Sequence, residues 1–294
     1  MPTHTLVILP EMEGKSIRSI ALSQIGMSSG QFKRAKFQGS ILLDGVRVTA
    51  DVRAKAGQTL ELLVPETASS QPSAWDVPLK IVYEDEHLWA IDKPAPMPSA
   101  PSVKQDTPTL ENVLFAHLGQ PEQFIYRPVN RLDKGTSGLM IVARDAHAQH
   151  LLQKMLHTDT FIREYLAVVD GQMPGQEGVI DLPIAKADGA TVRREVRPDG
   201  KEARTFYRVI KSGKRSLLRL RLDTGRTHQI RVHTAYHGCP VTGDFLYGTE
   251  LPHLLPGRFA LHSAMIHFRH PITGQWIRLE SQLPDQLERL LEDL

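Results

Sequence analysis

Residues 130–139, with the sequence NRLDKGTSGL, join a polar turn to an apolar run that ends at Ala143. Two glycines and several small polar residues predict the turn, and the apolar run after them predicts a buried strand. Asp133 therefore stands at the entrance of a strand, between Arg131 and Lys134. The two cations favour the charged form of its carboxylate, which could then act as a nucleophile. The alternative is a turn aspartate that caps its own backbone, the commoner role of Asp in such a position.

The sequence on both sides of this turn predicts short strands with few helices between them. Asp145 could cap a helix whose apolar residues recur between 148 and 156 at helical spacing, and leucines at helical spacing also mark residues 284–294. Strands are predicted at 79–83, 88–92, 139–143, 165–169, 218–222 and 276–279. We therefore expect an α+β fold, with a mainly antiparallel mixed sheet flanked by helices and loops.

Residues 65–78, PETASSQPSAWDVP, divide the chain. Three prolines and no glycine in this stretch predict an extended, semi-rigid linker. It separates a small N-terminal segment, residues 1–64, from a body formed by residues 79–294.

The N-terminal segment predicts a small αβ module. Its expected elements are a helix at 17–24, a second helix starting at Ser28-Ser29, a hairpin turning at Asp44-Gly45 and a strand at 59–64. The second helix carries three cations, which could bind RNA or form a solvated helix face: Lys33, Arg34 and Lys36. This arrangement resembles the S-four-type RNA-binding module.

Charge is unevenly distributed along the chain. Lys plus Arg number 35 and Asp plus Glu number 33, so the formal net charge is only +2. Residues 193–231, however, have a net charge of +9, and residues 280–294 have a net charge of −4. The basic segment predicts salt-dependent binding to a phosphate backbone. The alternative is a solvated sheet edge whose charges prevent aggregation.

Several classes of protein are disfavoured by the sequence. Cys239 is the single cysteine, so no internal disulfide and no cysteine-based metal site can form. His233 and His237 have i, i+4 spacing, but no Glu follows His233, so we expect no zinc helix. A signal-peptide pattern and a membrane-length apolar run are both lacking, so we expect a soluble, cytoplasmic protein. We expect turns rather than phosphate-binding loops, because no helix pattern follows them, at four glycines: Gly225, Gly238, Gly243 and Gly248.

The turn NRLDKGTSGL resembles the catalytic motif of RluA-type pseudouridine synthases, and other motifs follow in the family's order. They are IDKP at 91–94, REYLA at 163–167, LDTGRTHQIRVHTAYHGCPVTGDFLYG at 222–248, LHSA at 261–264 and the pairs His270-Pro271 and Thr273-Gly274. The resemblance covers residues 79–284, essentially the whole body. Two positions depart from the family: Asn130 replaces a usual His, and Pro96 replaces a usual Gly, which should stiffen the loop at 95–102.

The resemblance implies that the protein detaches uracil from its ribose in RNA, rotates it and rejoins it through a ring carbon. Asp133 would be the catalytic carboxylate, attacking the anomeric carbon or the uracil ring, or removing a ribose proton. Tyr165 and Arg231 would be catalytic as well. Tyr165 would pack on the uracil and could assist proton removal from the ring, and Arg231 would pair with Asp133 and keep it ionised. Arg131 would help to hold the site open after the target base has left the stack. Other motif residues are expected to bind substrate: Lys134, Thr136, Arg226, His228 and Gln229.

Taken without the resemblance, the same residues have plainer interpretations. A tyrosine on a strand, such as Tyr165, is more often a half-buried packing residue, and an arginine on an alternating strand, as Arg231 is expected to be, is more often a surface charge.

The resemblance also implies the partners. We expect an RNA substrate, with ribosomal RNA favoured over transfer RNA, a monomer, and neither cofactor, metal nor membrane partner. Two other functions stay open: an RNA-binding or ribosome-assembly protein whose catalysis is dispensable, and a hydrolytic nucleoside glycosidase that uses a carboxylate at an anomeric carbon.

Overall fold

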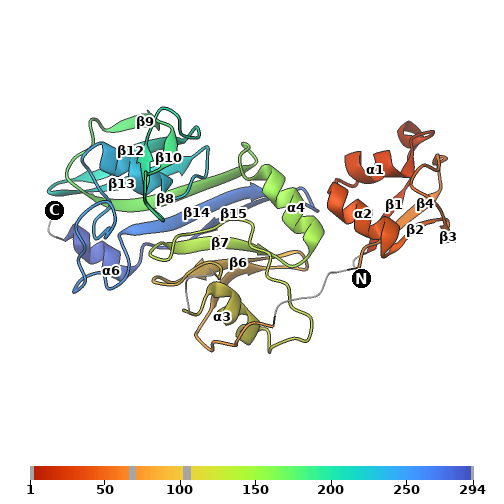
Figure 1. Cartoon of the computed structure of the whole chain (residues 1–294), viewed down its shortest axis with the longest axis horizontal. Coiled ribbons are helices and arrows are strands. Elements are labelled where there is room, and N and C mark those ends of the chain that lie inside the picture. Colours follow the sequence, from red (N-terminus) through yellow and green to blue (C-terminus); the bar gives the residue numbers. More distant parts are fainter. Residues whose placement is uncertain (1–2, 66–70, 102–106, 293–294) are drawn as a thin grey trace.

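The protein is described by a computed structural model that covers residues 3–65, 71–101 and 107–292, and it has a small N-terminal unit beside a larger body (Figure 1). The predicted linker at 65–78 falls partly on residues 66–70, which lie outside the described residues. Residue 102 of the proline-rich loop also lies outside them.

The N-terminal unit packs two helices against a four-stranded antiparallel sheet of order β1-β4-β2-β3. A capping box begins α2, because Ser28 Oγ accepts from the Gln31 amide at 3.1 Å while Gln31 Oε1 accepts from the Ser28 amide at 2.8 Å. Both predicted helices and the hairpin are confirmed, and a first strand that we did not predict completes the sheet. The elements are β1 (Thr3–Val7), η1 (Pro10–Met12), α1 (Ile17–Ser23), α2 (Ser29–Phe37), β2 (Ser40–Leu43), β3 (Val46–Arg47) and β4 (Thr59–Leu63).

The body is built on a nine-stranded sheet of order β5-β6-β7-β14-β8-β13-β12-β9, with β15 paired to β14. Among the described strands, only β7 and β14 pair in parallel, so the predicted mainly antiparallel mixed sheet is confirmed. The strands are β5 (Lys80–Glu84), β6 (Leu88–Lys93), β7 (Ser137–Ala143), β8 (Phe161–Asp170), β9 (Glu177–Asp181), β12 (Arg204–Ser212), β13 (Arg215–Leu222), β14 (Leu261–Arg269) and β15 (Trp276–Glu280). A separate two-stranded hairpin consists of β10 (Ile184–Lys186) and β11 (Arg194–Val196).

Helices cover both faces of the sheet at β6 and β7 but only part of the sheet elsewhere, and the pattern of buried residues in each strand reflects this difference. Every residue of β7 is buried, because α3 (Leu110–His117) packs near one face of β6 and β7 while α4 (Ala146–Met155) packs near the other. Asp145 caps α4 as predicted, accepting from the amides of His147 and Ala148. In β13, buried and more exposed residues alternate, as expected of a strand with one solvated face.

Two segments in the C-terminal part of the body, residues 229–236 and 285–291, are helical. Residues 229–236 form α5 (Gln229–Tyr236), so the expected strand at Arg231 is wrong, and a helix does follow Gly225. The leucine pattern at 284–294 gives α6 (Asp285–Glu288) and η2 (Arg289–Leu291), while residues 293–294 lie outside the described part.

Candidate active site

The turn that carries Asp133 is fixed by its neighbours on both sides. Ser99 Oγ donates to the Leu132 carbonyl at 2.6 Å and accepts from the Leu132 amide at 3.0 Å. Gly138, one residue into β7, has φ +105°, and a Cβ there would lie 2.3 Å from the Ser263 carbonyl oxygen. Glycine is therefore required where β7 meets β14, and this close approach sets the position from which Asp133 projects.

Lys93, at the end of β6, stabilises the loop that contacts this turn. It is fully buried, and its Nζ donates to the carbonyls of Pro94 at 3.0 Å and Met97 at 2.7 Å. The Met97 amide in turn donates to the Lys134 carbonyl at 2.9 Å, which joins the proline-rich loop to the turn. Burial lowers the pKa of Lys93 to about 7, although the charge of Asp133 opposes this change.

Arg231 projects from α5 and joins two carboxylates. Its Nη1 donates to Asp133 Oδ2 at 3.0 Å, while its Nε and Nη2 donate to Asp244 Oδ2 and Oδ1 at 2.6 and 2.9 Å. Burial alone would lower the pKa of Arg231, but Asp244 and Asp133 outweigh this effect and raise it. Arg231 is thus a permanent cation aimed at Asp133.

Aromatic rings surround the same guanidinium. The Arg231 Cζ lies 4.2 Å from the ring centre of Phe259, 5.0 Å from that of Tyr247 and 5.6 Å from that of Phe245. These contacts are within the range of cation–π attraction and leave little room for another side-chain position.

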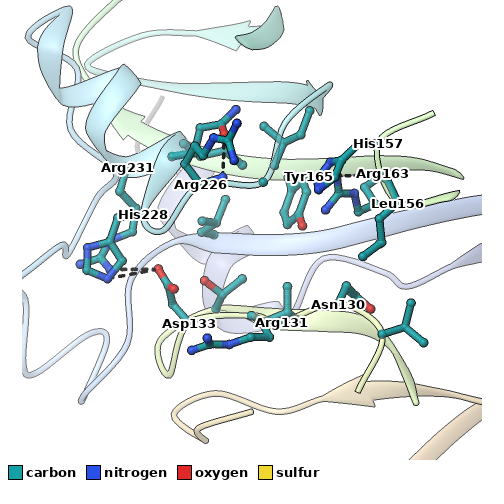
Figure 2. A pocket seen from close by; sticks show the side chains of 18 residues that line it. Asn130, Arg131, Asp133, Leu156, His157, Arg163, Tyr165, Arg226, His228 and Arg231 are labelled. Atoms are coloured by element: carbon teal, nitrogen blue, oxygen red, sulfur yellow. Dashed lines mark hydrogen bonds and ion pairs between the residues drawn. The ribbon is translucent and has the colours of Figure 1, made fainter. Parts of the chain in front are cut away.

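Asp133 lines two cavities, of which Figure 2 shows the smaller. The smaller, of about 240 Å³, is lined by Tyr165 from β8, together with Leu261 and Ile230. The larger, of about 530 Å³, extends toward the β10–β11 hairpin and is lined by Arg194. Asp133 itself is only partly covered, with 30% of its side chain exposed, so a ligand in either cavity can reach it.

Tyr165 faces the smaller cavity from the buried face of the sheet (Figure 2). Burial raises its pKa above the usual 10, and the Asp133 charge contributes in the same direction, so the phenol keeps its proton. Its ring offers an apolar wall against which a planar base could pack.

The structure brings most of the predicted substrate-binding residues to these cavities. Arg131, Arg226 and His228 line both, Lys134 lines the larger and Thr136 the smaller. Gln229 lines the smaller one, but its amide is engaged within the protein: its nitrogen donates to Arg204 O and Thr205 Oγ1, and its oxygen accepts from Thr224 Oγ1 and the Arg226 amide. The three α2 cations lie in the N-terminal unit and line neither cavity: Lys33, Arg34 and Lys36.

The structure also shows the roles of Asn130, where the chain departs from the family motif, and of His233, which was considered as a metal ligand. Asn130 lines the smaller cavity, and its Oδ1 accepts from the Ile141 amide at 2.8 Å, so it holds the turn against β7. His233 is buried and bonded to Thr205 Oγ1 and the Leu182 carbonyl, which makes it a structural residue of α5. Among the described residues, no group of three or more His, Cys, Asp or Glu is arranged to hold a metal ion.

The basic segment 193–231 does not form one surface. Leu220 pairs directly with Tyr165, so its strand neighbours Arg219 and Arg221 point to the opposite face. Arg204 and Arg208 are paired with acids, at 2.6 Å from Asp181 and 3.1 Å from Glu177. Fewer basic residues of the segment lie on the cavity side. They are Arg194, Arg226 and Arg231 at the larger cavity, and Arg197 and Lys201 around an adjoining cavity of about 600 Å³, which Lys186 from outside the segment also lines.

Sequence reasoning missed the residues that support Arg231. Asp244 and Tyr247 lie inside a motif quoted above, but nothing in the local sequence shows that they face Arg231. Phe259 precedes the LHSA motif by two residues and carries no polar group that would mark it.

The fold defines the class of protein. The structure matches human RNA Pseudouridylate Synthase Domain Containing 4 with a TM-score of 0.59 at 24% identity, covering 72% of this chain and 91% of that one. Human RNA Pseudouridylate Synthase Domain Containing 1 matches with the same TM-score at 22% identity, over 74% of this chain and 94% of that one. The body therefore has the fold of a pseudouridylate synthase domain.

The sequence comparisons name the family. The family model described as RNA pseudouridylate synthase matches residues 87–236. A Bacillus subtilis protein named uncharacterized RNA pseudouridine synthase YjbO is 36% identical over 92% of this chain and 96% of its own length. The ribosomal large subunit pseudouridine synthase D of Nitrosomonas europaea is 38% identical over 89% of this chain and 80% of its own length. The chain belongs to the RNA pseudouridine synthase family, and it is an isomerase that converts uridine in RNA to pseudouridine.

Proposed function

We propose that this enzyme modifies uridines of ribosomal RNA in the cytoplasm, as a monomer, with Asp133 as its catalytic carboxylate. The observation that carries the assignment of Asp133 is its pairing: Oδ2 accepts from Arg231 Nη1 at 3.0 Å, while the carboxylate faces both cavities. The guanidinium keeps the carboxylate ionised and fixes its direction. Attack on the anomeric carbon, attack on the ring and removal of a ribose proton each need such an ionised, accessible oxygen.

Tyr165 and Arg131 have separate roles in this proposal. Uracil enters the smaller cavity and packs on the Tyr165 ring, because the cavity wall there is apolar. Arg131 is exposed and lines both cavities, so it stands where a flipped nucleotide leaves its helix. The reaction is an isomerisation: the glycosidic C–N bond breaks, a C–C bond forms, the ring carbon loses its proton and the released ring nitrogen gains one.

RNA binding has two supports. The larger cavity and the adjoining 600 Å³ cavity share Arg194 and Arg226, which gives phosphates a basic path beside Asp133. The α2 cations Lys33 and Lys36 are exposed in the N-terminal unit, and we propose that this S-four-like unit binds RNA away from the site. Ribosomal RNA is favoured because the Nitrosomonas europaea relative is named a ribosomal large subunit enzyme.

No helix in the described part of the chain is long and apolar enough to cross a membrane.

The experiment compares three strains: one without the protein, one with Asp133→Asn and one with the matched exposed variant Asp159→Asn. Pseudouridines are mapped across all cellular RNA in each strain. We expect the deletion and Asp133→Asn to lose the same ribosomal RNA position, and Asp159→Asn to keep it. Purified Asp133→Asn should still bind the RNA, since the substitution leaves the basic path intact. Full modification by Asp133→Asn would refute the assignment of Asp133, and a lost position in transfer RNA alone would refute the choice of ribosomal RNA.

A further inference from the structure

His228 occupies an unusual backbone position at the edge of both cavities. It precedes α5 with φ 60° and ψ 19°, a left-handed conformation that a residue with a Cβ adopts only at a cost of about 1 kcal/mol. Of the described non-glycine residues with positive φ, His228 alone lines the two cavities around Asp133. The conformation places its imidazole between Asp133 and Tyr247, with Nε2 at 3.9 Å from Asp133 Oδ2 and Nδ1 at 2.8 Å from the Tyr247 hydroxyl oxygen (Figure 2 shows His228 and Asp133).

The hydrogen atoms around Tyr247 can be assigned from its partners. The Arg194 amide donates to the Tyr247 hydroxyl oxygen at 2.8 Å, so the oxygen already accepts one bond. Burial raises the pKa of Tyr247 above 10, so the phenol also has a hydrogen to donate. Among the described residues, His228 Nδ1 is the only other hydrogen-bond partner of this hydroxyl. The phenol therefore donates to Nδ1, and the proton of a neutral imidazole must be on Nε2.

The surroundings also favour the neutral form of this imidazole. Burial lowers the pKa of His228 below its usual value. Four charged groups face the ring: Asp133 and Asp244 raise its pKa, and Arg231 and Arg194 lower it. A protonated ring would have to donate from Nδ1 to Tyr247, whose hydroxyl hydrogen would then lose its acceptor.

A gap separates His228 Nε2 from the Asp133 carboxylate. The separation of 3.9 Å from Nε2 to Oδ2 is too long for a direct hydrogen bond. An oxygen to one side of the line that joins the two atoms could lie at about 2.8 Å from each and bridge them. That oxygen must accept from Nε2–H and donate to the carboxylate, which a hydroxyl can do. The carbonyl oxygens of uracil cannot donate, and its N–H cannot accept, whereas an RNA nucleotide carries a 2′-hydroxyl.

We propose that His228, held by Tyr247 as the Nε2–H tautomer, binds the ribose 2′-hydroxyl of the target nucleotide together with Asp133, and that this pair distinguishes RNA from DNA. The proposal rests on the proposed role of Asp133 and adds the group that recognises the sugar. Tyr247 is a positioning residue, since it acts on the substrate only through His228. The β10–β11 hairpin takes part as well, because the Arg194 amide at the start of β11 occupies the other side of the Tyr247 hydroxyl.

The tautomer can be measured without substrate. Long-range ¹H–¹⁵N correlation spectra of the ¹⁵N-labelled full chain at pH 7 should show one ring with an unprotonated Nδ1 and a protonated Nε2 that is absent from His228→Gln. The matched variant His237→Gln should retain it. In Tyr247→Phe the same ring should populate both tautomers and titrate at a higher pH. An imidazolium or an Nδ1–H tautomer at pH 7, or an unchanged tautomer in Tyr247→Phe, would overturn the proposal.

The recognition step is tested with the ribosomal RNA fragment that contains the mapped uridine, made once with ribose and once with 2′-deoxyribose at that position. We expect the wild type to prefer the ribose substrate in kcat/KM, and we expect His228→Ala to reduce this preference by about 10- to 100-fold. His228→Gln, which retains an N–H donor near the Nε2 position, should restore part of it. An equal preference in wild type and His228→Ala would refute the role of His228. A wild type that forms no pseudouridine on the ribose substrate would instead refute the proposed ribosomal substrate, and the tautomer spectra would still decide the arrangement of His228 and Tyr247.

Discussion

Replacing Asp244 by asparagine should be among the most damaging conservative changes in the body. Asp244 is completely buried and accepts four hydrogen bonds, from Arg231 Nε and Nη2 and from the amides of Leu246 and Tyr247. Asparagine retains the shape but removes the charge, and its NH₂ group would face donors. Removing one partner of a buried ion pair costs about 3–5 kcal/mol, and here the buried guanidinium would be left with only the partly exposed Asp133 as its counter-ion. For a domain of this size, the melting temperature should then fall by roughly 6–20 °C.

Activity should fall together with stability. Without Asp244, the Arg231 guanidinium keeps only its Nη1 bond to Asp133 and loses the two bonds that fix its orientation. A displacement of about 1 Å at a catalytic group can cost about 100-fold in rate, and we expect a loss of this order in kcat. The assays are urea unfolding at pH 7 and pseudouridine formation on transcribed ribosomal RNA at a temperature where the variant is folded.

Asp181→Asn is the matched control, because it removes the same chemistry from the surface. Asp181 pairs with Arg204 at 2.6 Å, but about half of each side chain is exposed. Exposed pairs contribute about 0–1 kcal/mol, so this variant should be nearly as stable and as active as wild type. If Asp244→Asn lost no more stability than Asp181→Asn and kept its kcat, the reasoning about Arg231 would be refuted.

Three further predictions concern single positions. Lys93→Met should remove a pH dependence of the stability. Between about pH 7 and 10.5 the lysine binds a proton in the unfolded state but not in the folded state, so the stability of the wild type relative to the variant, measured by urea unfolding, should rise by roughly 4–5 kcal/mol over that range. A difference that does not change with pH would contradict the buried neutral lysine. Gly138→Ala should give little folded protein, since its Cβ would meet the Ser263 backbone; normal yield and melting temperature would show that β7 and β14 can separate at no cost. Ser28→Ala should lower the stability of the N-terminal unit by about 1 kcal/mol, because the Gln31 amide loses its hydrogen-bond acceptor. Thermal unfolding can measure this loss against the control Ser29→Ala, which changes the neighbouring serine.

Local signals in the sequence predicted those elements that local contacts form. Ser28 and Asp145 cap helices with their own side chains, so the residues that mark these helix starts also make them. Ile230, Arg231 and Val232 alternate as in a strand, but the segment is a helix. Its first-turn residue Gln229 is bound to one backbone carbonyl and one side chain of β12, and such a tertiary contact cannot be read from periodicity.

The sequence predicted the site residues that the family motifs assign, but not the residues that position them. Asp133, Tyr165 and Arg231 were named from the resemblance, and the structure brings all three to one cavity. Asp244 could not be selected from sequence, because choosing it among 33 acidic residues requires knowing which carboxylate faces Arg231. Charge counting over residues 193–231 likewise could not show that Arg219 and Arg221 point away from the cavities, since strand pairing decides that direction.

The order of strands in the body determines how much of the chain must be synthesised before the site can form. Asp133 leads into β7 and Tyr165 lies on β8, yet β14, synthesised more than ninety residues after Tyr165, lies between these two strands. A nascent chain that has reached residue 250 already contains Asp133, Tyr165 and Arg231, but it lacks the strand that spaces them. Catalytic competence therefore requires synthesis through β14, and a product that ends before this strand would bear the motifs without the ability to alter RNA.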